Sequence, residues 1–318
     1  MPTKTENYKG KKGFNVLNTE HFGIQRKIVA NMTTQSWNEA PHCSYVYEPD
    51  ITDFMKEYEK LRNSSDHPLK ISINTLMLRI VVEGIKKAPQ INGHLKYQKR
   101  LVRGKFKTFS DINISMPMIL PGGEMMTINL HNFEDKSLNE MAEYIENVRE
   151  KIKNTNLTQA MFDVSLDNTM QALKHFKIMT TVCRLVGAKL GKHRVVTLKG
   201  KAKKEYKKIP NDIKLTKSDI EQGTITVSNL GPLYRGSSIG KPVLLNIIPP
   251  QVFAIAIGSI IEKPGVYTDE KGEKQIGIRK YMPLCLSFDH RALDFGDVVP
   301  FLTRLDGIFE KPEQINNW

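Results

Sequence analysis

The chain has 318 residues, of which 40% are apolar, and its formal charge at pH 7 is +13. This apolar content can bury a substantial core, which excludes a disordered chain. No window reaches the roughly 18 consecutive apolar residues of a membrane-spanning helix, and the polar, lysine-rich first twenty residues exclude a signal peptide.

Cys43, Cys183 and Cys285 are odd in number and far apart in the sequence. This pattern excludes a disulfide framework and a Cys-x-x-Cys metal site, so no metal is predicted and a reducing cytoplasm is the expected location. The positive charge indicates a polyanionic partner, for which nucleic acid, an anionic membrane surface and a phosphorylated cofactor such as CoA are the candidates.

The positive charge is densest over residues 184–208, where Glu205 is the one acid. We interpret this segment as a solvated surface insertion, near residues 184–217, that keeps the protein in solution. Tyr206 is nearly alone among the basic residues, whereas nucleic-acid sites alternate cations with aromatic stacking platforms. The composition therefore argues against nucleic acid as the partner.

The first third of the chain is predicted to alternate helices with short strands. Residues 1–20 read as an irregular arm, a helix begins near Ile24, and a strand is predicted over 44–47. Two further helices are recognised by apolar residues at helical spacing: Phe54, Tyr58 and Leu61 after a cap at 50–52, then Ile73, Leu76, Ile80 and Ile85 before Pro89.

The middle of the chain predicts a hairpin followed by a long helix. Apolar and polar residues alternate over 111–118 and 125–130, and a Pro-Gly-Gly turn at 121–123 joins them. Ser137 with Glu140 forms a capping box. The helix that follows carries a buried stripe of Leu138, Met141, Ile145, Val148 and Ile152.

The last third is rich in predicted strands, at 224–227, 252–257 and 282–288, and ends on a helix with Pro300 in its first turn. Helices at both ends with strands between them favour an α+β layer structure over a strictly alternating parallel sheet.

Residues 287–294 place a histidine, His290, between charged residues where a predicted strand meets the last helix. A rigid strand end can present a base to a cleft, and a neutral imidazole accepts a proton at physiological pH. Taken alone, such a histidine is more often an ordinary surface or core residue than a catalytic base.

Four motifs, in the same order along the chain, give the sequence a resemblance to one enzyme family. Residues 26–32 read R-K-I-V-A-N-M, with A-P-H at 40–42 and D-I-T at 50–52; residues 223–231 read G-T-I-T-V-S-N-L-G, 249–258 read P-P-Q-V-F-A-I-A-I-G, and 289–294 read D-H-R-A-L-D. Together they resemble the catalytic domains of the 2-oxo acid dehydrogenase complex acyltransferases, or dihydrolipoyl acyltransferase cores, which are related to chloramphenicol acetyltransferase.

The resemblance implies a single catalytic domain over 21–318. Its implied fold is the two-layer α+β fold of CoA-dependent acyltransferases, a mixed sheet with helices on one face. The implied activity moves an acyl group between a CoA thioester and a thiol, as on a lipoyl group, or a hydroxyl. The family's pattern makes His290 the general base, Ser228 the hydrogen-bond donor to the tetrahedral oxyanion, and Asp294 and Arg26 a buried, supporting ion pair.

The resemblance also implies a homotrimer, alone or in a higher assembly, in which His290 of one chain faces Ser228 of its neighbour. The catalytic match starts by about residue 20, so we expect a stand-alone domain without its own lipoyl group, using acyl-CoA and an acceptor such as a lipoyl-bearing protein. Phe295 stands where the family has glycine, which keeps a second interpretation open: a non-catalytic relative that binds CoA or a partner protein as a regulator or scaffold.

Overall fold

The computed structural model describes residues 4–8, 11–64, 69–120, 125–174, 178–231, 233 and 240–318. The chain divides into two compact units, one of residues 1–30 with 156–205 and one of residues 31–155 with 206–318. Two of the three boundaries fall within α1 (Ile24–Glu39) and α7 (Gly200–Lys208), and the third falls between residues 155 and 156. The motifs from residue 40 onward all belong to the second unit, which therefore contains His290 and Ser228.

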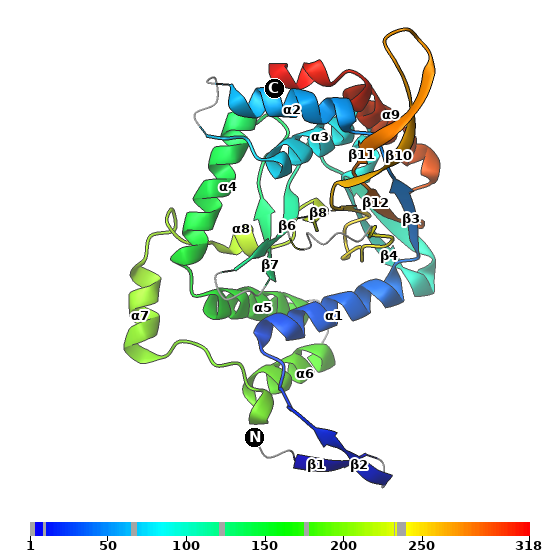
Figure 1. Ribbon diagram of the computed structural model, residues 1–318. Helices are drawn as coiled ribbons and strands as arrows, with labels where there is room; N and C mark the ends of the chain where they lie inside the picture. The colour runs from blue at the N-terminus through cyan, green and yellow to red at the C-terminus, as the bar shows by residue number, and fades with distance from the viewer. Residues whose placement is uncertain are drawn as a thin grey trace. The chain divides into compact units, whose positions relative to one another are not determined.

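The second unit is built on a six-stranded sheet in the order β3-β12-β9-β8-β6-β7 (Figure 1). Its strands are β3 (His42–Tyr47), β6 (Ile114–Ile119), β7 (Met125–Leu130), β8 (Ile225–Asn229), β9 (Phe253–Ile257) and β12 (Leu284–Asp289). Strands β6, β8 and β9 are parallel, and the other pairings are antiparallel. The predicted mixed sheet and α+β class are confirmed.

Helices pack against one face of this sheet. They are α2 (Thr52–Asn63), α3 (Ile73–Lys87), α4 (Leu138–Lys153) and α9 (Phe295–Glu310). The ring of Phe253 in β9 lies 6.0 Å from that of Phe301 in α9, and both side chains are fully buried. Because side chains alternate along a strand, this contact assigns Phe253, Ile255 and Ile257 to the helix-covered face.

The predicted helix stripes are confirmed. Every member of the stripe in α4 is buried, and the capping box of Ser137 and Glu140 is formed. Pro300 was placed wrongly: α9 begins at Phe295, so the proline lies beyond the first turn. The predicted turn at 121–123 lies outside the described residues. None of the helices in the described part of the chain has the length and hydropathy needed to span a membrane.

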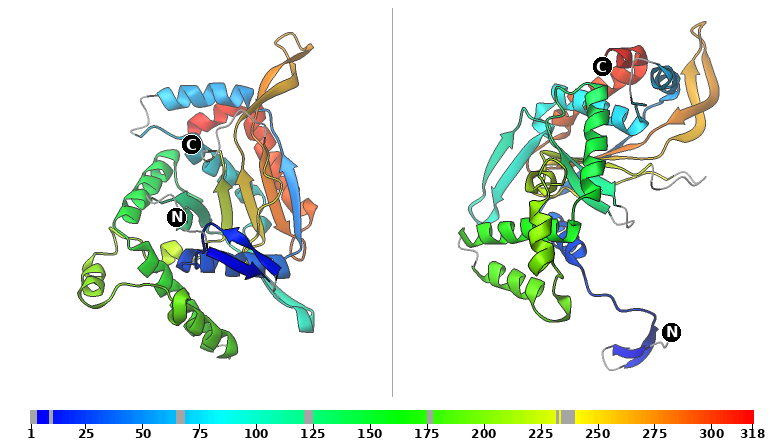
Figure 2. Two further views of the ribbon diagram at one scale, coloured as in Figure 1. Left: turned by 60° about the horizontal axis from the view of Figure 1, so that its bottom comes forward. Right: turned by 90° about the vertical axis from the view of Figure 1, so that its left-hand side faces the viewer.

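Two antiparallel ribbons of the second unit were not predicted. One pairs β4 (Gly93–Gln98) with β5 (Arg103–Thr108), and the other pairs β10 (Ile261–Thr268) with β11 (Lys274–Tyr281) (Figure 2). The short helix α8 (Lys217–Ile220) precedes β8. These ribbons carry charged residues among their apolar ones, which weakens the alternation on which strand prediction depends.

The first unit contains α5 (Leu157–Lys174), α6 (Ile178–Lys189) and a ribbon of β1 (Lys4–Tyr8) with β2 (Lys11–Val16). The prediction of an irregular arm is therefore wrong for these two strands. They pair through backbone hydrogen bonds, which leave no apolar pattern in the sequence. Most of the basic residues over 189–208 are exposed, and α7 buries none of its residues.

Candidate active site

The turn that carries His290 is fixed by its backbone. The amide of Asp289 donates to the carbonyl of Val252 at 2.9 Å, and the amide of His290 donates to that of Pro41 at 3.1 Å. The Asp289 carboxylate is buried and accepts three hydrogen bonds from the Arg291 side chain, two from Nε at 3.0 and 3.2 Å and one from Nη2 at 2.6 Å. These bonds raise the pKa of the Arg291 guanidinium. The motif thus supplies its own ion pair within the turn.

The imidazole of His290 is about half exposed, at 51%. Its Nδ1 lies 3.2 Å from the carbonyl oxygen of Leu293. A carbonyl oxygen can only accept, so Nδ1 is the protonated nitrogen of the neutral ring, and Nε2 keeps its lone pair. The turn therefore presents a histidine with a free basic nitrogen, the chemical form that a general base requires.

Asp294 lies beside this histidine. One of its carboxylate oxygens is 3.3 Å from His290 Nδ1, and its side chain is 83% exposed. Arg26, its predicted partner, lies in the first turn of α1, within the other compact unit. The Asp294 carboxylate is therefore exposed where a buried one was expected, and its pairing with Arg26 stays a prediction.

Phe295 is accommodated without a glycine. It is the first residue of α9, so its backbone is in the right-handed helical region that any residue adopts. Its ring packs at 5.0 Å from that of Tyr45 in β3. The structure thus gives no backbone reason for the family's glycine at this position, and the turn after the base keeps a regular form.

Ser228 lies in β8 on the sheet face opposite to the helices. Val227 and Asn229, its neighbours, line a cavity together with residues of α3 and α4, so alternation directs Ser228 to the other side. Its side chain is nearly buried, at 5% exposure. Among the described residues, none forms a hydrogen bond with its hydroxyl, which leaves that donor available to a ligand.

Two motif residues fix the strand that carries this serine. Gln251 is buried, accepts a 2.6 Å hydrogen bond from the Thr226 hydroxyl and donates a 2.9 Å bond to the carbonyl of Gly223. Asn229 donates to Asn74 at 2.7 Å. Gln251 of the P-P-Q segment is therefore hydrogen-bonded to the strand that carries Ser228, so the two motifs are parts of one structural unit.

A segment that the sequence did not assign crosses part of the same face. The amide of Leu245 donates to the buried Ser287 hydroxyl at 3.0 Å, and the amide of Ile247 donates to His42 Nε2 at 3.0 Å. The carbonyl of Ile247 accepts a 2.6 Å bond from Ser36. His42, from the A-P-H motif, thus anchors this segment, a role visible only in the folded chain.

Ser228 and His290 lie at opposite ends of the sheet within one chain. Ser228 is level with Ala256 in β9, and Ala256 is level with Cys285 in β12. His290 follows Cys285 by five positions on a strand two places away. At about 3.3 Å per residue and 4.8 Å per strand, the two backbones are about 19 Å apart. One chain does not bring these two residues together.

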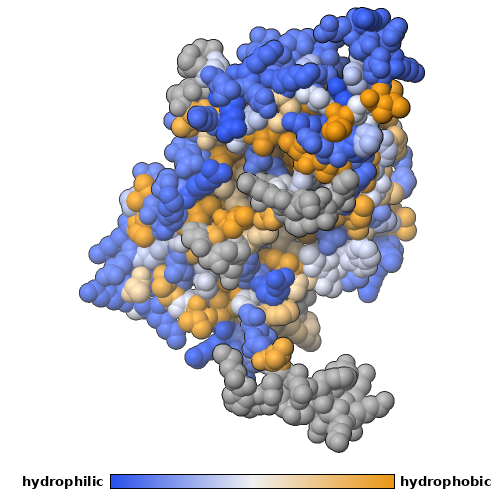
Figure 3. Space-filling view, in the orientation of Figure 1, coloured by the Kyte–Doolittle hydropathy of each residue, from blue (hydrophilic) through white to orange (hydrophobic). Residues whose placement is uncertain are grey.

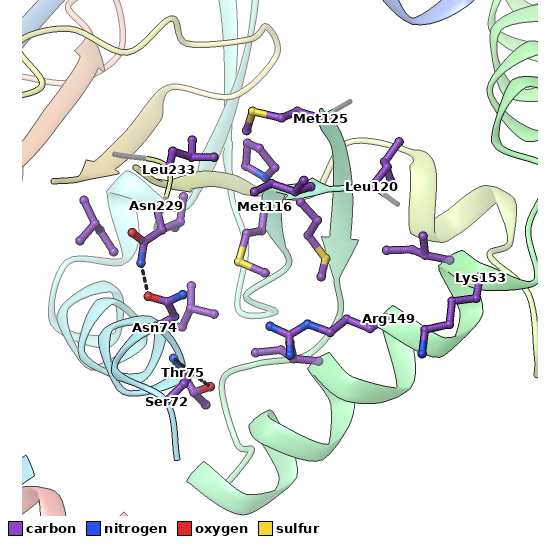
Figure 4. Close-up of a pocket in the computed structure, with 18 residues that line it drawn as sticks. Ser72, Asn74, Thr75, Met116, Leu120, Met125, Arg149, Lys153, Asn229 and Leu233 are labelled. Atoms are coloured by element: carbon purple, nitrogen blue, oxygen red, sulfur yellow. Dashed lines mark hydrogen bonds between the residues drawn. The ribbon is translucent and has the colours of Figure 1, made fainter. Parts of the chain in front are cut away.

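The cavity beside Asn229 lies on the helix-covered face, with a volume of about 410 Å³. Figure 4 shows Met116 and Met125 at one side of it, Arg149 extending from α4, and the bond between Asn229 and Asn74. Apolar side chains gather in the hollow below the hydrophilic surface of α2 in Figure 3. The sheet separates this cavity from the Ser228 hydroxyl, so it is a different site.

Comparisons with known proteins agree with the motifs. The family model of the 2-oxoacid dehydrogenases acyltransferase (catalytic domain) matches residues 17–165 and 189–316. The dihydrolipoyllysine-residue acetyltransferase component of the mitochondrial pyruvate dehydrogenase complex of Schizosaccharomyces pombe is 23% identical over 293 residues, which are 91% of this chain and 45% of that protein. The chain thus spans less than half of that relative.

Two solved structures share the fold. The cubic core of a pyruvate dehydrogenase multienzyme complex aligns over 99% of this chain and 100% of its own, with a TM-score of 0.61 and 17% identity. The dihydrolipoamide acetyltransferase of Azotobacter vinelandii, studied for the catalytic roles of a serine, a histidine and an asparagine, aligns over 99% and 100% with a TM-score of 0.59 and 17% identity. The chain belongs to the family of 2-oxoacid dehydrogenase acyltransferase catalytic domains.

Proposed function

We propose that this protein transfers an acyl group between a CoA thioester and the thiol of a dihydrolipoyl group, with His290 as the general base. The observation that carries this proposal is the hydrogen bond from His290 Nδ1 to the carbonyl of Leu293, which leaves Nε2 as a free base at a rigid strand end. The names of the relatives support the lipoyl thiol as one of the two partners.

In the proposed reaction, Nε2 of His290 accepts the proton of the attacking thiol. The sulfur forms a bond to the acyl carbon, and the carbonyl electrons move to oxygen. The Ser228 hydroxyl donates a hydrogen bond to this oxyanion. When the tetrahedral intermediate collapses, the carbon–sulfur bond to the other thiol breaks, and the departing sulfur takes the proton from Nε2. Protons and electrons balance in either direction.

The proposed active site lies between two copies of the chain. Since Ser228 and His290 of one chain are about 19 Å apart, they can serve one substrate only if the histidine of one copy faces the serine of another. A twofold dimer and a closed ring of three or more copies both permit this pairing, and the resemblance to the family favours the ring of three. We propose a homotrimer, and trimers assembled into a larger core would resemble the cubic core of the structural neighbour.

The acceptor is proposed to be a lipoyl group on a different domain, acting in the cytoplasm. No metal takes part in the proposed reaction. CoA is a polyanion, and the net charge of +13 favours its approach.

The experiment is an acyl-transfer assay with acetyl-CoA and dihydrolipoamide, in which free CoA is separated and quantified over time. Wild type is expected to exceed the uncatalysed rate, and His290→Ala is expected to lower kcat by about 10² to 10⁴ because the base is lost. CoA binding and the oligomeric state of the variant serve as the folding control. A wild-type rate retained in His290→Ala would refute the mechanism.

A further inference from the structure

The ribbon of β4 and β5, residues 93–108, is strongly basic. It contains six lysines and arginines and no aspartate or glutamate, and all six are exposed. They are Lys96, Lys99, Arg100, Arg103, Lys105 and Lys107. Figure 2 shows this teal ribbon projecting from the main sheet. A run of charged residues in a solvated loop is common and indicates no function by itself. Here, however, the register of the two strands determines which charged side chains share a face.

The register separates cations from aromatic residues. Lys96 pairs with Lys105, and Gln98 pairs with Arg103, so these side chains and Lys107 share one face of the ribbon. On the other face, the rings of Tyr97 and Phe106 lie against Gly104 and Gly93, where an added Cβ would meet them at 3.5 and 2.6 Å. One face is therefore cationic and the other aromatic.

The cationic face is not neutralised within the chain. None of its lysines and arginines forms an ion pair with any residue that the structure describes. Lys96 and Lys105 are directly opposite each other, at a cross-strand spacing where like charges destabilise the pair. An arrangement that is unfavourable in the free protein becomes favourable when an anionic surface covers it.

The ribbon is attached directly to the catalytic turn. The Arg291 guanidinium lies 5.5 Å from the centre of the Tyr97 ring, and the amide of Leu95 donates to the carbonyl of Pro250 at 2.8 Å. At its base, His94 Nε2 is 3.2 Å from the carbonyl of Gly223, which precedes the strand of Ser228. The aromatic face of the ribbon therefore borders the turn of His290, and a partner on the cationic face lies one ribbon's thickness from that turn.

The tip of the ribbon is apolar and unusually shaped. Leu101 and Val102 are 60% and 78% exposed. Val102 has φ 49 and ψ 44, a left-handed conformation that is costly for a β-branched residue. Two exposed aliphatic side chains therefore lie at the end of the cationic face, where a docked partner would bury them.

We propose that the β4–β5 ribbon is the docking surface for an acidic, lipoyl-bearing protein domain that delivers its thiol to His290. The proposal rests on the proposed function and adds the partner's chemistry to it. Cations over two strands of six residues, with an apolar tip, extend about 20 Å, which suits the surface of a folded domain. Two cavities beside Asn229 and one beside Tyr144 are lined by other residues. The aromatic rings lie on the face opposite to the cations, unlike the stacking platforms of nucleic-acid sites.

The test compares two synthetic peptides that carry the same reduced lipoyl-lysine. One has glutamates around the lysine, and the other has glutamines in the same positions. In the acyl-transfer assay at low ionic strength, wild type is expected to show a KM for the acidic peptide about tenfold below that for the neutral peptide. This ratio is expected to fall toward one in the variant Lys96→Gln, Lys105→Gln, Lys107→Gln, and in wild type as salt is raised.

The matched control is the variant Lys204→Gln, Lys207→Gln, Lys208→Gln, which removes the same charge from exposed lysines of α7. It is expected to keep the wild-type ratio. The KM values for free dihydrolipoamide and acetyl-CoA are expected to be the same in all three proteins. If the control variant loses the ratio as fully as the ribbon variant, net charge and not the ribbon is responsible, and the proposal is wrong.

Four further outcomes separate the alternatives. Equal KM values for the two peptides in wild type overturn the docking proposal. If the ribbon variant shows a higher KM for acetyl-CoA, the ribbon binds the phosphates of CoA instead. If wild type binds single-stranded DNA more tightly than the acidic peptide, the ribbon is a nucleic-acid site instead. If wild type has no activity on dihydrolipoamide, the proposed function fails, and fluorescence anisotropy of the two labelled peptides then decides the docking proposal by itself.

Discussion

His290 Nδ1 lies 3.3 Å from a carboxylate oxygen of Asp294, four residues further along the chain. The carboxylate and the carbonyl of Leu293 can both accept from the same Nδ1–H, so each contributes to the orientation of the ring. An amide oxygen accepts a hydrogen bond as a carboxylate does.

We therefore expect Asp294→Asn to keep kcat within about threefold of wild type and Asp294→Ala to lower it about fivefold, the effect of one hydrogen bond. The measurement is kcat with saturating acetyl-CoA and dihydrolipoamide. Equal losses in both variants would show that the charge of Asp294, and not its acceptor oxygen, matters.

The predicted ion pair of Arg26 with Asp294 is measured by a double-mutant cycle. If the pair forms in the assembled protein, Arg26→Gln lowers the free energy of unfolding more in wild type than in Asp294→Asn, by about 1 kcal/mol or more. Strictly additive effects of the two substitutions on stability and on kcat would show that Arg26 and Asp294 do not form a pair.

An active site shared between copies allows two inactive variants to complement each other. His290→Ala and Ser228→Ala are each expected to lose about 10² to 10³ or more in kcat. When the two are co-expressed, random assembly of rings gives about one quarter of the sites both intact residues, and the activity is expected to recover to about that share of wild type. Variants purified separately and mixed without exchange of subunits are the control. No recovery in proven mixed oligomers would place both residues in one chain's site.

Asp219 gives the protein a stability term that depends on pH. Burial raises the pKa of its carboxyl, but the nearby His131 ring, at 3.5 Å, and hydrogen bonds from the amide and hydroxyl of Thr216 outweigh burial and lower that pKa to about 2. In the unfolded chain the value is about 3.9, so the ionised form stabilises the fold by about 2 kcal/mol above pH 4. This stabilisation is lost as the pH falls from about 4 to about 2. Urea unfolding of wild type and Asp219→Asn should differ at pH 7 and converge at pH 2; a difference that stays constant with pH would contradict this.

Phe295→Gly restores the glycine of the family motif but is not expected to raise kcat, because α9 already begins at this residue with ordinary helical geometry. It is expected to lower the free energy of unfolding by about 1 kcal/mol through loss of the ring contact with Tyr45. Phe295→Leu, which keeps an apolar side chain, is the control. A tenfold gain in kcat for the glycine variant would show that the ring obstructs catalysis.

The sequence alone determined the features that depend on local geometry. The stripe from Leu138 to Ile152 follows the helical period, and the cap of Ser137 with Glu140 needs residues only three apart. Both can therefore be predicted from one short stretch of sequence. The motif around His290 could be recognised for the same reason, because its residues are neighbours in the sequence. Its ion pair, Asp289 with Arg291, involves residues two apart, yet the sequence did not show which of its charges would pair.

Tertiary structure decided everything that depends on register between distant strands. The separation of Ser228 from His290 follows from the pairing of β8, β9 and β12, which no single segment encodes. The cationic face of the β4–β5 ribbon likewise appears only when Lys96 is placed opposite Lys105. The physical reason is the two-residue period of a strand, because a shift of register by one residue turns every side chain to the other face.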